Sequence, residues 1–376
     1  MQFRDSETQK LLRDTVRSYL ADKFPAQRLY AIERGEEQVA GPQLKEFADL
    51  GWLGLLAPES AGGAGASLLD AAVVSEEFGY GAVPAPVTLS NVATYVLARA
   101  PVAAAEAHLK NLAAGARFYT VSESTRRQER LAYWGHPPGA PLSASGGRLN
   151  GVLPLVPFAD VADFALAPLV VDGEAAFAVL DLAQARRQQV KLLDRASYFH
   201  LHFDNVALGD SLILARGQQA AEQHEQCDVL ATGLTLIELV GLMKRVTEMT
   251  GEYIANRVQF GQPIAKFQAA RHRAAEMLMR TETSRWAAYY ALWRLQEDDS
   301  DAQEIWLAKH WAIRGAETVY CNGHMLHGGI GVGIEHPLHL YSQQIASFLV
   351  RAGNLNEMVN RTVDSLDVRS VSVSVQ

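Results

Sequence analysis

The chain has 376 residues, of which 48% are hydrophobic and 20% are charged, and its net charge is −8 at pH 7. This composition is typical of a globular protein with two or three domains and excludes a disordered chain, and the scattered positive residues form no basic face for nucleic acid. The first residues lack the apolar core of a signal peptide and no stretch of about 20 residues is uninterruptedly apolar, so we expect a cytoplasmic protein without a nucleic-acid or membrane partner.

The first part of the chain is predicted to be helical. Apolar residues recur at steps of three to five residues over 11–24, and a second amphipathic stretch covers 44–55 before a glycine-rich turn. A third helix is predicted over 68–78, with an apolar side and with Glu76 and Glu77 on the opposite, polar side. These helices form a first domain, residues 1–117.

The middle of the chain changes to short apolar runs, which are separated by proline, glycine and aspartate. The segments 164–167 and 176–180 are typical of strands, and the sequence at 146–151 is typical of a turn. We therefore predict a β domain over residues 118–208.

Long helices are predicted again in a third domain, residues 209–376. Apolar residues at three- and four-residue steps predict a helix from about Asp228 to Arg257, and Pro263 separates it from a second helix, so the two form an antiparallel pair. Ser300 and Gln303 have the spacing of a capping box, which predicts the start of a further helix. The fold class is therefore mainly α with a β middle domain.

The candidates for a metal or disulfide site are few. The two cysteines, Cys227 and Cys321, form neither a CxxC pair nor a zinc-ligand pattern with histidines, and both are expected to be buried thiols. His324 and His327 are three residues apart at a predicted helix end, but no third ligand accompanies them, so a capping or core role is the better interpretation. We predict no metal site.

Four motifs occur in order along the chain. They are FADLGWLGL at 47–55 with GGAG at 62–65, YIANRVQFGQPI at 253–264 with Phe-Gln at 267–268, LHGGIG at 326–331, and EHP at 335–337. With these motifs the chain resembles the acyl-CoA dehydrogenase family over nearly all of its length. The resemblance implies an N-terminal helical domain, a β-barrel and a C-terminal four-helix bundle, flavin adenine dinucleotide (FAD) as cofactor, and assembly as a dimer of dimers.

The resemblance also implies which residues bind the cofactor. In the family, the arginine that matches Arg257 reaches across a subunit interface towards the FAD diphosphate, an anion that a guanidinium binds well. Phe260 is expected to pack against the cofactor and Gln268 to hydrogen bond with it. Without the surrounding motif, these three residues would be read as ordinary helix-end and turn residues.

Four further positions belong to the expected FAD site. Gly328 and Gly329 allow a close backbone approach to the adenosine end, although the same pair can simply end the helix. Met325 stands where the family usually has a glutamine. Ser122 resembles the threonine that lies beside the flavin in the family.

The glutamate that performs catalysis in the family is missing. One of its known positions, counted from the EHP motif without a gap, is Ala352, and the alternative position on the long helix is Ala231. A two-residue gap in the first count leads to Val350 or Asn354, and neither of these is a carboxylate. An alanine cannot accept the α-proton of an acyl thioester.

Two acidic residues near Ala231 are weak candidates for the missing base. Asp228 lies one turn earlier and Glu238 two turns later on the predicted helix. The simpler interpretation is a first-turn acid for Asp228 and a surface or interface charge for Glu238.

These observations predict half of an active site. A branch of the family pairs two related chains in an α2β2 tetramer, in which one chain keeps the glutamate and the other completes the flavin pocket, and this chain resembles the second kind. The expected reaction is the α,β-desaturation of an acyl-CoA, including bulky or steroid side-chain acyl groups, with electron-transfer flavoprotein as acceptor. The alternatives are a self-sufficient homomeric enzyme that uses a base such as Asp228, and a non-catalytic binding or scaffold protein.

Overall fold

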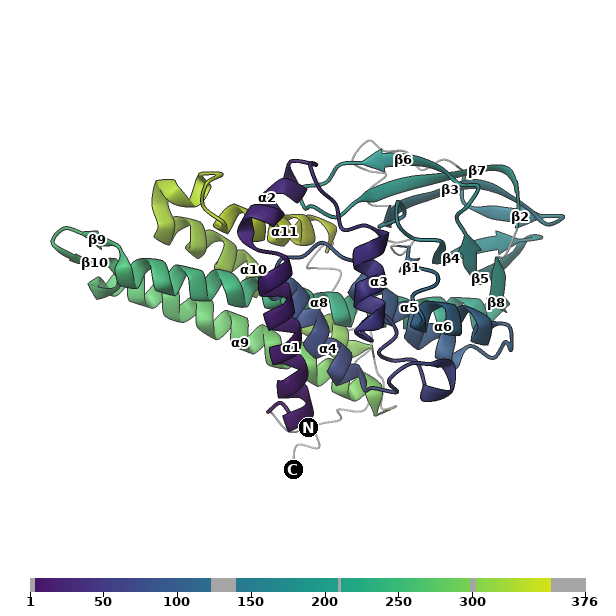
Figure 1. Ribbon diagram of the computed structural model, residues 1–376, viewed down its shortest axis with the longest axis horizontal. Coiled ribbons are helices and arrows are strands. Elements are labelled where there is room, and N and C mark those ends of the chain that lie inside the picture. Colours follow the sequence, from purple (N-terminus) through teal and green to yellow (C-terminus); the bar gives the residue numbers. More distant parts are fainter. Residues whose placement is uncertain (1–3, 123–139, 209–210, 298–301, 353–376) are drawn as a thin grey trace, which may run out of the picture.

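The structure is a computed structural model that describes residues 4–122, 140–208, 211–297 and 302–352. Helices precede and follow the β domain along the chain, and in space the sheet lies at one end of the molecule, on the right in Figure 1. The first seven elements are α1 (Glu7–Lys23), α2 (Ala26–Glu33), α3 (Gly41–Asp49), η1 (Glu59–Ala61), α4 (Leu68–Tyr80), α5 (Val87–Arg99) and α6 (Ala105–Ala113). The expected class, mainly α with a β middle domain, is confirmed.

The β domain is one eight-stranded sheet. Its strands are β1 (Tyr119–Val121), β2 (Ser143–Ser145), β3 (Arg148–Pro157), β4 (Phe164–Val171), β5 (Glu174–Asp181), β6 (Arg186–Val190), β7 (Tyr198–Ala207) and β8 (Leu212–Arg216). They are hydrogen bonded in the order β6-β7-β3-β2-β4-β5-β8, and β1 pairs with β4. The sheet thus continues past residue 208 with β8, whereas the expected domain limits themselves stay a prediction.

Strand β4 is buried on both faces of the sheet over most of its length. Phe164 and Leu166 of β4 pack into the large core that the helices share, while the alternate residues Ala165 and Ala167 belong to a second core inside the β domain. Successive side chains of a strand point to opposite faces of the sheet. Because both faces are buried here, every position is apolar, which explains the continuous apolar run in the sequence. Through the first of these faces, the sheet forms one wall of the pocket described below.

The C-terminal part contains the longest helices. Its elements are α8 (Gly217–Asn256), β9 (Val258–Gln259), β10 (Gln262–Pro263), η2 (Ile264–Lys266), α9 (Gln268–Gln296), α10 (Gln303–His327), η3 (Gly328–Val332) and α11 (Leu338–Arg351). Helix α8 packs against α4, α5, α9, α10 and α11 and is therefore the central element of the protein. No helix within the described ranges is both long and apolar enough to cross a membrane.

Two local expectations about this part were wrong, and a third lies partly outside the described residues. Helix α8 starts at Gly217 rather than near Asp228, because its first turns are polar and carry no apolar stripe. Helix α10 begins after Ala302, and the capping box of Ser300 and Gln303 stays a prediction because Ser300 lies outside the described residues. Of the two cysteines, only Cys227 is buried and Cys321 is exposed.

Helices α4 and α8 cross at two glycines. A Cβ atom on Gly79 would lie 1.9 Å from the backbone oxygen of Glu238, and a Cβ on Gly241 would lie 2.0 Å from that of Glu76. No side chain larger than hydrogen fits at such distances, so the two backbones are in direct contact.

Glu76 and Glu77 of α4 are both buried, which contradicts the expected polar side of this helix. Glu76 accepts hydrogen bonds from Arg285 Nε at 3.0 Å, from the Tyr289 hydroxyl at 2.7 Å and from Arg13 Nη2 at 3.1 Å. Burial by itself would raise the pKa of Glu76, but the charges of Arg13 and Arg285 outweigh it and lower the pKa to about 2. This cluster joins α1, α4 and α9.

We predict that Glu76→Gln lowers the free energy of unfolding by about 3–5 kcal/mol, because it removes the buried carboxylate that lies closest to Arg285 and leaves Arg285 with only a longer contact of 3.6 Å to Asp5. Urea denaturation measures the change. The matched control is Glu106→Gln, which breaks an exposed pair with Lys110 on α6 and is expected to change the free energy by about 0.5 kcal/mol or less. Equal effects of the two substitutions would contradict the structural role of the cluster.

Candidate functional site

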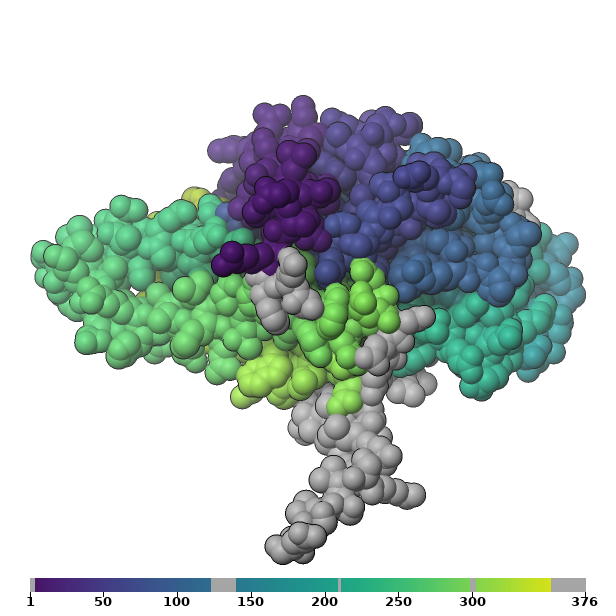
Figure 2. All heavy atoms as spheres, turned by 90° about the horizontal axis from the view of Figure 1, so that it is seen from below, coloured from purple at the N-terminus to yellow at the C-terminus, as the bar shows by residue number. Residues whose placement is uncertain are grey.

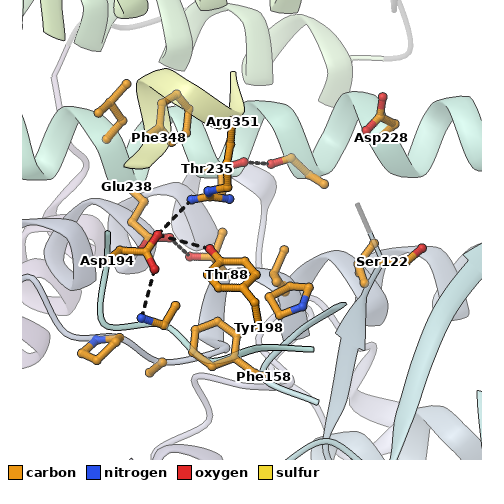
Figure 3. A pocket seen from close by; sticks show the side chains of 18 of the residues that line it. Thr88, Ser122, Phe158, Asp194, Tyr198, Asp228, Thr235, Glu238, Phe348 and Arg351 are labelled. Carbon is orange, nitrogen blue, oxygen red and sulfur yellow. Dashed lines mark hydrogen bonds and ion pairs between the residues drawn. The ribbon is translucent and has the colours of Figure 1, made fainter. Parts of the chain in front are cut away.

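A pocket lies between α8, the sheet, the start of α5 and the end of α11 (Figure 3). It encloses about 1020 Å³, including space that is open to solvent. Helix α8 lines it with His224, Cys227, Asp228, Ala231, Thr235, Glu238, Leu239 and Leu242. These residues recur at steps of one to four, so they share one face of the helix, and at 1.5 Å per residue they extend over about 27 Å.

The two alanines at the expected base positions lie in different surroundings. Ala231 lines the pocket. Ala352 is the C-cap of α11 and is buried against Ile313 of α10 instead. Val350 is exposed, and Asn354 lies outside the described residues. The pocket therefore has an inert methyl group where α8 could have presented a carboxylate.

Glu238 lies in this pocket and not on the surface, which corrects the expectation of a surface or interface charge. Glu238 lies on the same face of α8 as Ala231 and Thr235, which also line the pocket. Thr88 of α5 donates a hydrogen bond of 3.1 Å to Glu238 Oε2. Burial raises the pKa of Glu238 to about 7, and the hydrogen bond from Thr88 and the charge of Arg351 only partly oppose this effect.

Asp194 and Arg351 form an ion pair beside Glu238. Arg351 Nη2 lies 3.5 Å from Asp194 Oδ2, and the Ser347 hydroxyl donates a hydrogen bond of 2.5 Å to the same oxygen. The guanidinium carbon of Arg351 lies over the Tyr198 ring, 5.2 Å from the ring centroid. The carboxylate of Asp194 is thus the direct partner of Arg351, which acts on Glu238 only from a greater distance.

Asp228 and Ser122 lie at the opposite end of the pocket from Glu238 (Figure 3). Asp228 lines the pocket one turn before Ala231 on α8. Ser122 follows β1 directly, and its buried hydroxyl has no hydrogen-bond partner within the part of the chain that the structure describes. An unpartnered hydroxyl at a pocket wall is free to bind a ligand.

The other residues expected at the FAD site lie far from this pocket. Arg257, Phe260 and Gln268 belong to the hairpin that joins α8 and α9, at the opposite end of the molecule from the sheet (Figure 1). Seen from below, this end projects as a separate lobe (Figure 2). All three residues are exposed, and Phe260 is exposed by 92%.

Met325, Gly328 and Gly329 lie at the end of α10 and are exposed as well. Arg273 of α9 lies 3.3 Å from the Met325 sulfur and donates a hydrogen bond of 2.7 Å to Asn322, so this helix end is fixed beside α9. Gly328 has φ 62° and ψ −143°, a conformation that is open only to glycine. The structure therefore groups these residues with α9 and separates them from Ser122.

Comparisons with known proteins identify the family. The chain matches the N-terminal domain of acyl-CoA dehydrogenases over residues 6–116 and the C-terminal domain over residues 233–367. It is 30% identical over 297 residues to acyl-CoA dehydrogenase FadE28 of Mycobacterium tuberculosis, which is 77% of this chain and 81% of that protein. The chain belongs to the acyl-CoA dehydrogenase family.

Two solved structures are similar to this acyl-CoA dehydrogenase chain over almost its whole length. One is a variant of the steroid ACAD Tcur3481-Tcur3483, with a TM-score of 0.81, 27% identity and coverage of 96% of this chain and 97% of that chain. The other is the ChsE4-ChsE5 complex of Mycobacterium tuberculosis, with a TM-score of 0.84, 24% identity and coverage of 97% and 99%. The family is FAD-dependent, so the expected cofactor is confirmed together with the family and the fold.

Sequence patterns identified the hairpin residues of this acyl-CoA dehydrogenase chain but missed the polar end of the pocket. Asp194 precedes β7, Arg351 ends α11 and Glu238 lies within α8, so no local motif connects them. The one signal in the sequence was Glu238 itself, a charged residue in an apolar stretch of a long helix. Burying such a residue costs free energy, and residues of this kind are therefore candidates for a functional site.

The raised pKa of Glu238 makes a prediction about stability. The folded chain holds a proton between about pH 4.5 and pH 7 that the unfolded chain releases, so the free energy of unfolding falls as pH rises through this range, by up to about 3 kcal/mol. Glu238→Gln removes this titration and is expected to flatten the decline between pH 5 and pH 8. Urea denaturation of both proteins at several pH values measures the difference, and parallel curves would contradict it.

Proposed function

We propose that this chain is a subunit of an FAD-dependent acyl-CoA dehydrogenase, in which it completes the flavin site while a related chain supplies the catalytic glutamate. The observation that carries the proposal is the contrast between Ala231, which puts a methyl group at a base position of the family, and the exposed hairpin with Arg257 and Phe260. Both positions of the family's catalytic glutamate carry alanine, whereas Arg257, Phe260 and Gln268 of the cofactor motif are kept.

The exposed residues fit a flavin nucleotide. Arg257 offers a guanidinium to the diphosphate, Phe260 an apolar ring, and Gln268 a side-chain amide that both donates and accepts hydrogen bonds. Nothing in the described part of the chain lies within 4 Å of where a Cβ would stand on Gly328 or Gly329, so both backbones are accessible to a ligand. These groups face outwards, hence the flavin they hold lies against a neighbouring chain.

The same end of the molecule carries apolar side chains that a partner would cover. Those exposed by more than half are Val258, Phe260, Met325, Ile330, Val332 and Ile334. Exposed apolar surface of this kind is typical of protein interfaces. The two similar structures support a related partner, since Tcur3481-Tcur3483 and ChsE4-ChsE5 are each named as a pair of proteins.

In the proposed heteromer the partner's carboxylate removes the α-proton of the acyl-CoA. FAD supplies the acceptor for the hydride that leaves the β-carbon, and this chain positions that cofactor through Arg257, Phe260 and Gln268. We propose electron-transfer flavoprotein as the electron acceptor. The similarity to Tcur3481-Tcur3483, which is named as a steroid ACAD, supports a bulky or steroid side-chain acyl group as the substrate class.

Co-expression with a related acyl-CoA dehydrogenase chain tests the proposal. In the purified complex, Arg257→Ala is expected to lower the flavin content at least about tenfold, because a charge-assisted contact to the diphosphate is lost. Flavin absorbance per protein measures this, and Arg99→Ala, an exposed arginine at the end of α5, is the control. If the chain alone binds flavin stoichiometrically and oxidises acyl-CoA as fast as the pair, the proposal is wrong.

A second candidate is a self-sufficient homomeric enzyme that uses Asp228 as its base. The position of Asp228 in the same pocket as Ala231 favours it. This candidate predicts that the isolated chain turns over acyl-CoA, that Asp228→Asn lowers kcat at least about 10²-fold, as expected for a lost general base, and that flavin stays bound. Unchanged turnover in the Asn variant would exclude Asp228.

A further inference from the structure

One end of the pocket is polar, and its polar residues have no role in the reaction proposed above. Glu238, Thr88, Asp194 and Arg351 gather at this end, close to the last turns of α11 (Figure 3). The remaining wall is largely apolar and consists mainly of Ala85, Leu89, Val121, Phe158, Leu166, Phe177, Leu239, Leu242 and Phe348. Such a combination of apolar walls with a few convergent polar groups is typical of a small-molecule site.

Glu238 has unused hydrogen-bonding capacity. Its carboxyl group receives one hydrogen bond, from Thr88 to Oε2, and none to Oε1 from any residue that the structure describes. The Thr88 hydroxyl is itself 3.2 Å from the Ser75 hydroxyl, so this donor is held in place from behind. An oxygen of a pocket-lining carboxyl that accepts no hydrogen bond from the protein is available to a ligand in the pocket.

The charges at this end select against a charged ligand tail. Arg351 is already paired with Asp194, and the side chain of Asp194 is only 5% exposed. A ligand carboxylate would thus approach two acidic groups, and the nearby cation is already engaged by one of them, which is unfavourable. A neutral hydroxyl fits, because it donates to a carboxylate and accepts from a protonated carboxyl, so it matches Glu238 in either state.

The shape of the pocket defines the rest of the ligand. The lining residues extend over about 27 Å of α8, from His224 to Leu242. Asp228 and Ser122 lie at one end and Glu238 lies towards the other (Figure 3). A ligand that reaches Glu238 from the Ser122 end is therefore long and apolar between its two polar ends.

We propose that this pocket binds an elongated acyl ligand with a hydroxyl group at its far end, and that Glu238 recognises this hydroxyl. The ligand passes Ala231, whose methyl group cannot accept its α-proton. The inference concerns this chain's own pocket and does not depend on the flavin contacts of the hairpin.

Three acyl-CoA probes of equal length test the proposal on the purified full chain. Isothermal titration calorimetry compares 12-hydroxydodecanoyl-CoA, dodecanoyl-CoA and dodecanedioyl-CoA, which end in a hydroxyl, a methyl and a carboxylate group. The hydroxyl probe is expected to bind about tenfold more tightly than the methyl probe, as one hydrogen bond to a buried acidic group provides, and the carboxylate probe is expected to bind most weakly. Equal affinities, or no binding of any probe, would overturn the proposal.

Two variants assign the preference to Glu238. Glu238→Leu is expected to abolish the preference for the hydroxyl probe, whereas Glu238→Gln, which still donates and accepts hydrogen bonds, retains most of it. A hydroxyl preference that survives in Glu238→Leu would contradict the assignment. If the Leu variant does not fold, the wild-type comparison of the three probes still decides whether the pocket selects a hydroxyl. Flavin content is not read in this experiment, so its outcome is separate from the test of the heteromer.

Discussion

The direct contact between the backbones of α4 and α8 determines the arrangement of the surrounding helices. Gly79 and Gly241 leave no space for a Cβ at this crossing. The close approach places the Glu76 cluster on one side of the contact, where α4 meets α1 and α9. It also presses the backbone of Glu238 against α4, so that the side chain of this residue is directed to the pocket instead. A single packing constraint thus positions both a structural carboxylate and the carboxyl group of the candidate site.

Two glutamates in neighbouring helices, the buried Glu76 and the partly buried Glu238, have opposite electrostatic environments. Glu76 is surrounded by Arg13, Arg285 and Lys244, which keep its pKa low despite full burial. Glu238 has one hydroxyl donor and a cation that is already paired with Asp194, so burial dominates and its pKa rises. The first glutamate is a structural ion, whereas the second is able to exchange a proton near neutral pH.

Much of the fold was predictable from the sequence, because long apolar stripes and short apolar runs record which faces are buried. The motif around Arg257 also identified the family, which the comparisons confirmed. The burial of Glu76 and the location of Glu238 were not predictable, since their partners Arg285 and Thr88 are more than a hundred residues away in the chain. The start of α8 was missed for a simpler reason: its first turns are polar, and hydrophobic periodicity does not detect a solvated helix.

The uncovered ring of Phe260 has a consequence for how the chain is produced. It stands at a hairpin tip with 92% of its surface in water, although covering such a ring would contribute about 1.5–3 kcal/mol. Until a neighbour covers it, this tip is available to any other apolar surface that it meets after synthesis. In the proposed heteromer, matched amounts of the two chains therefore protect this chain from aggregation. Copies made in excess of the partner keep the tip exposed and are the ones that aggregate.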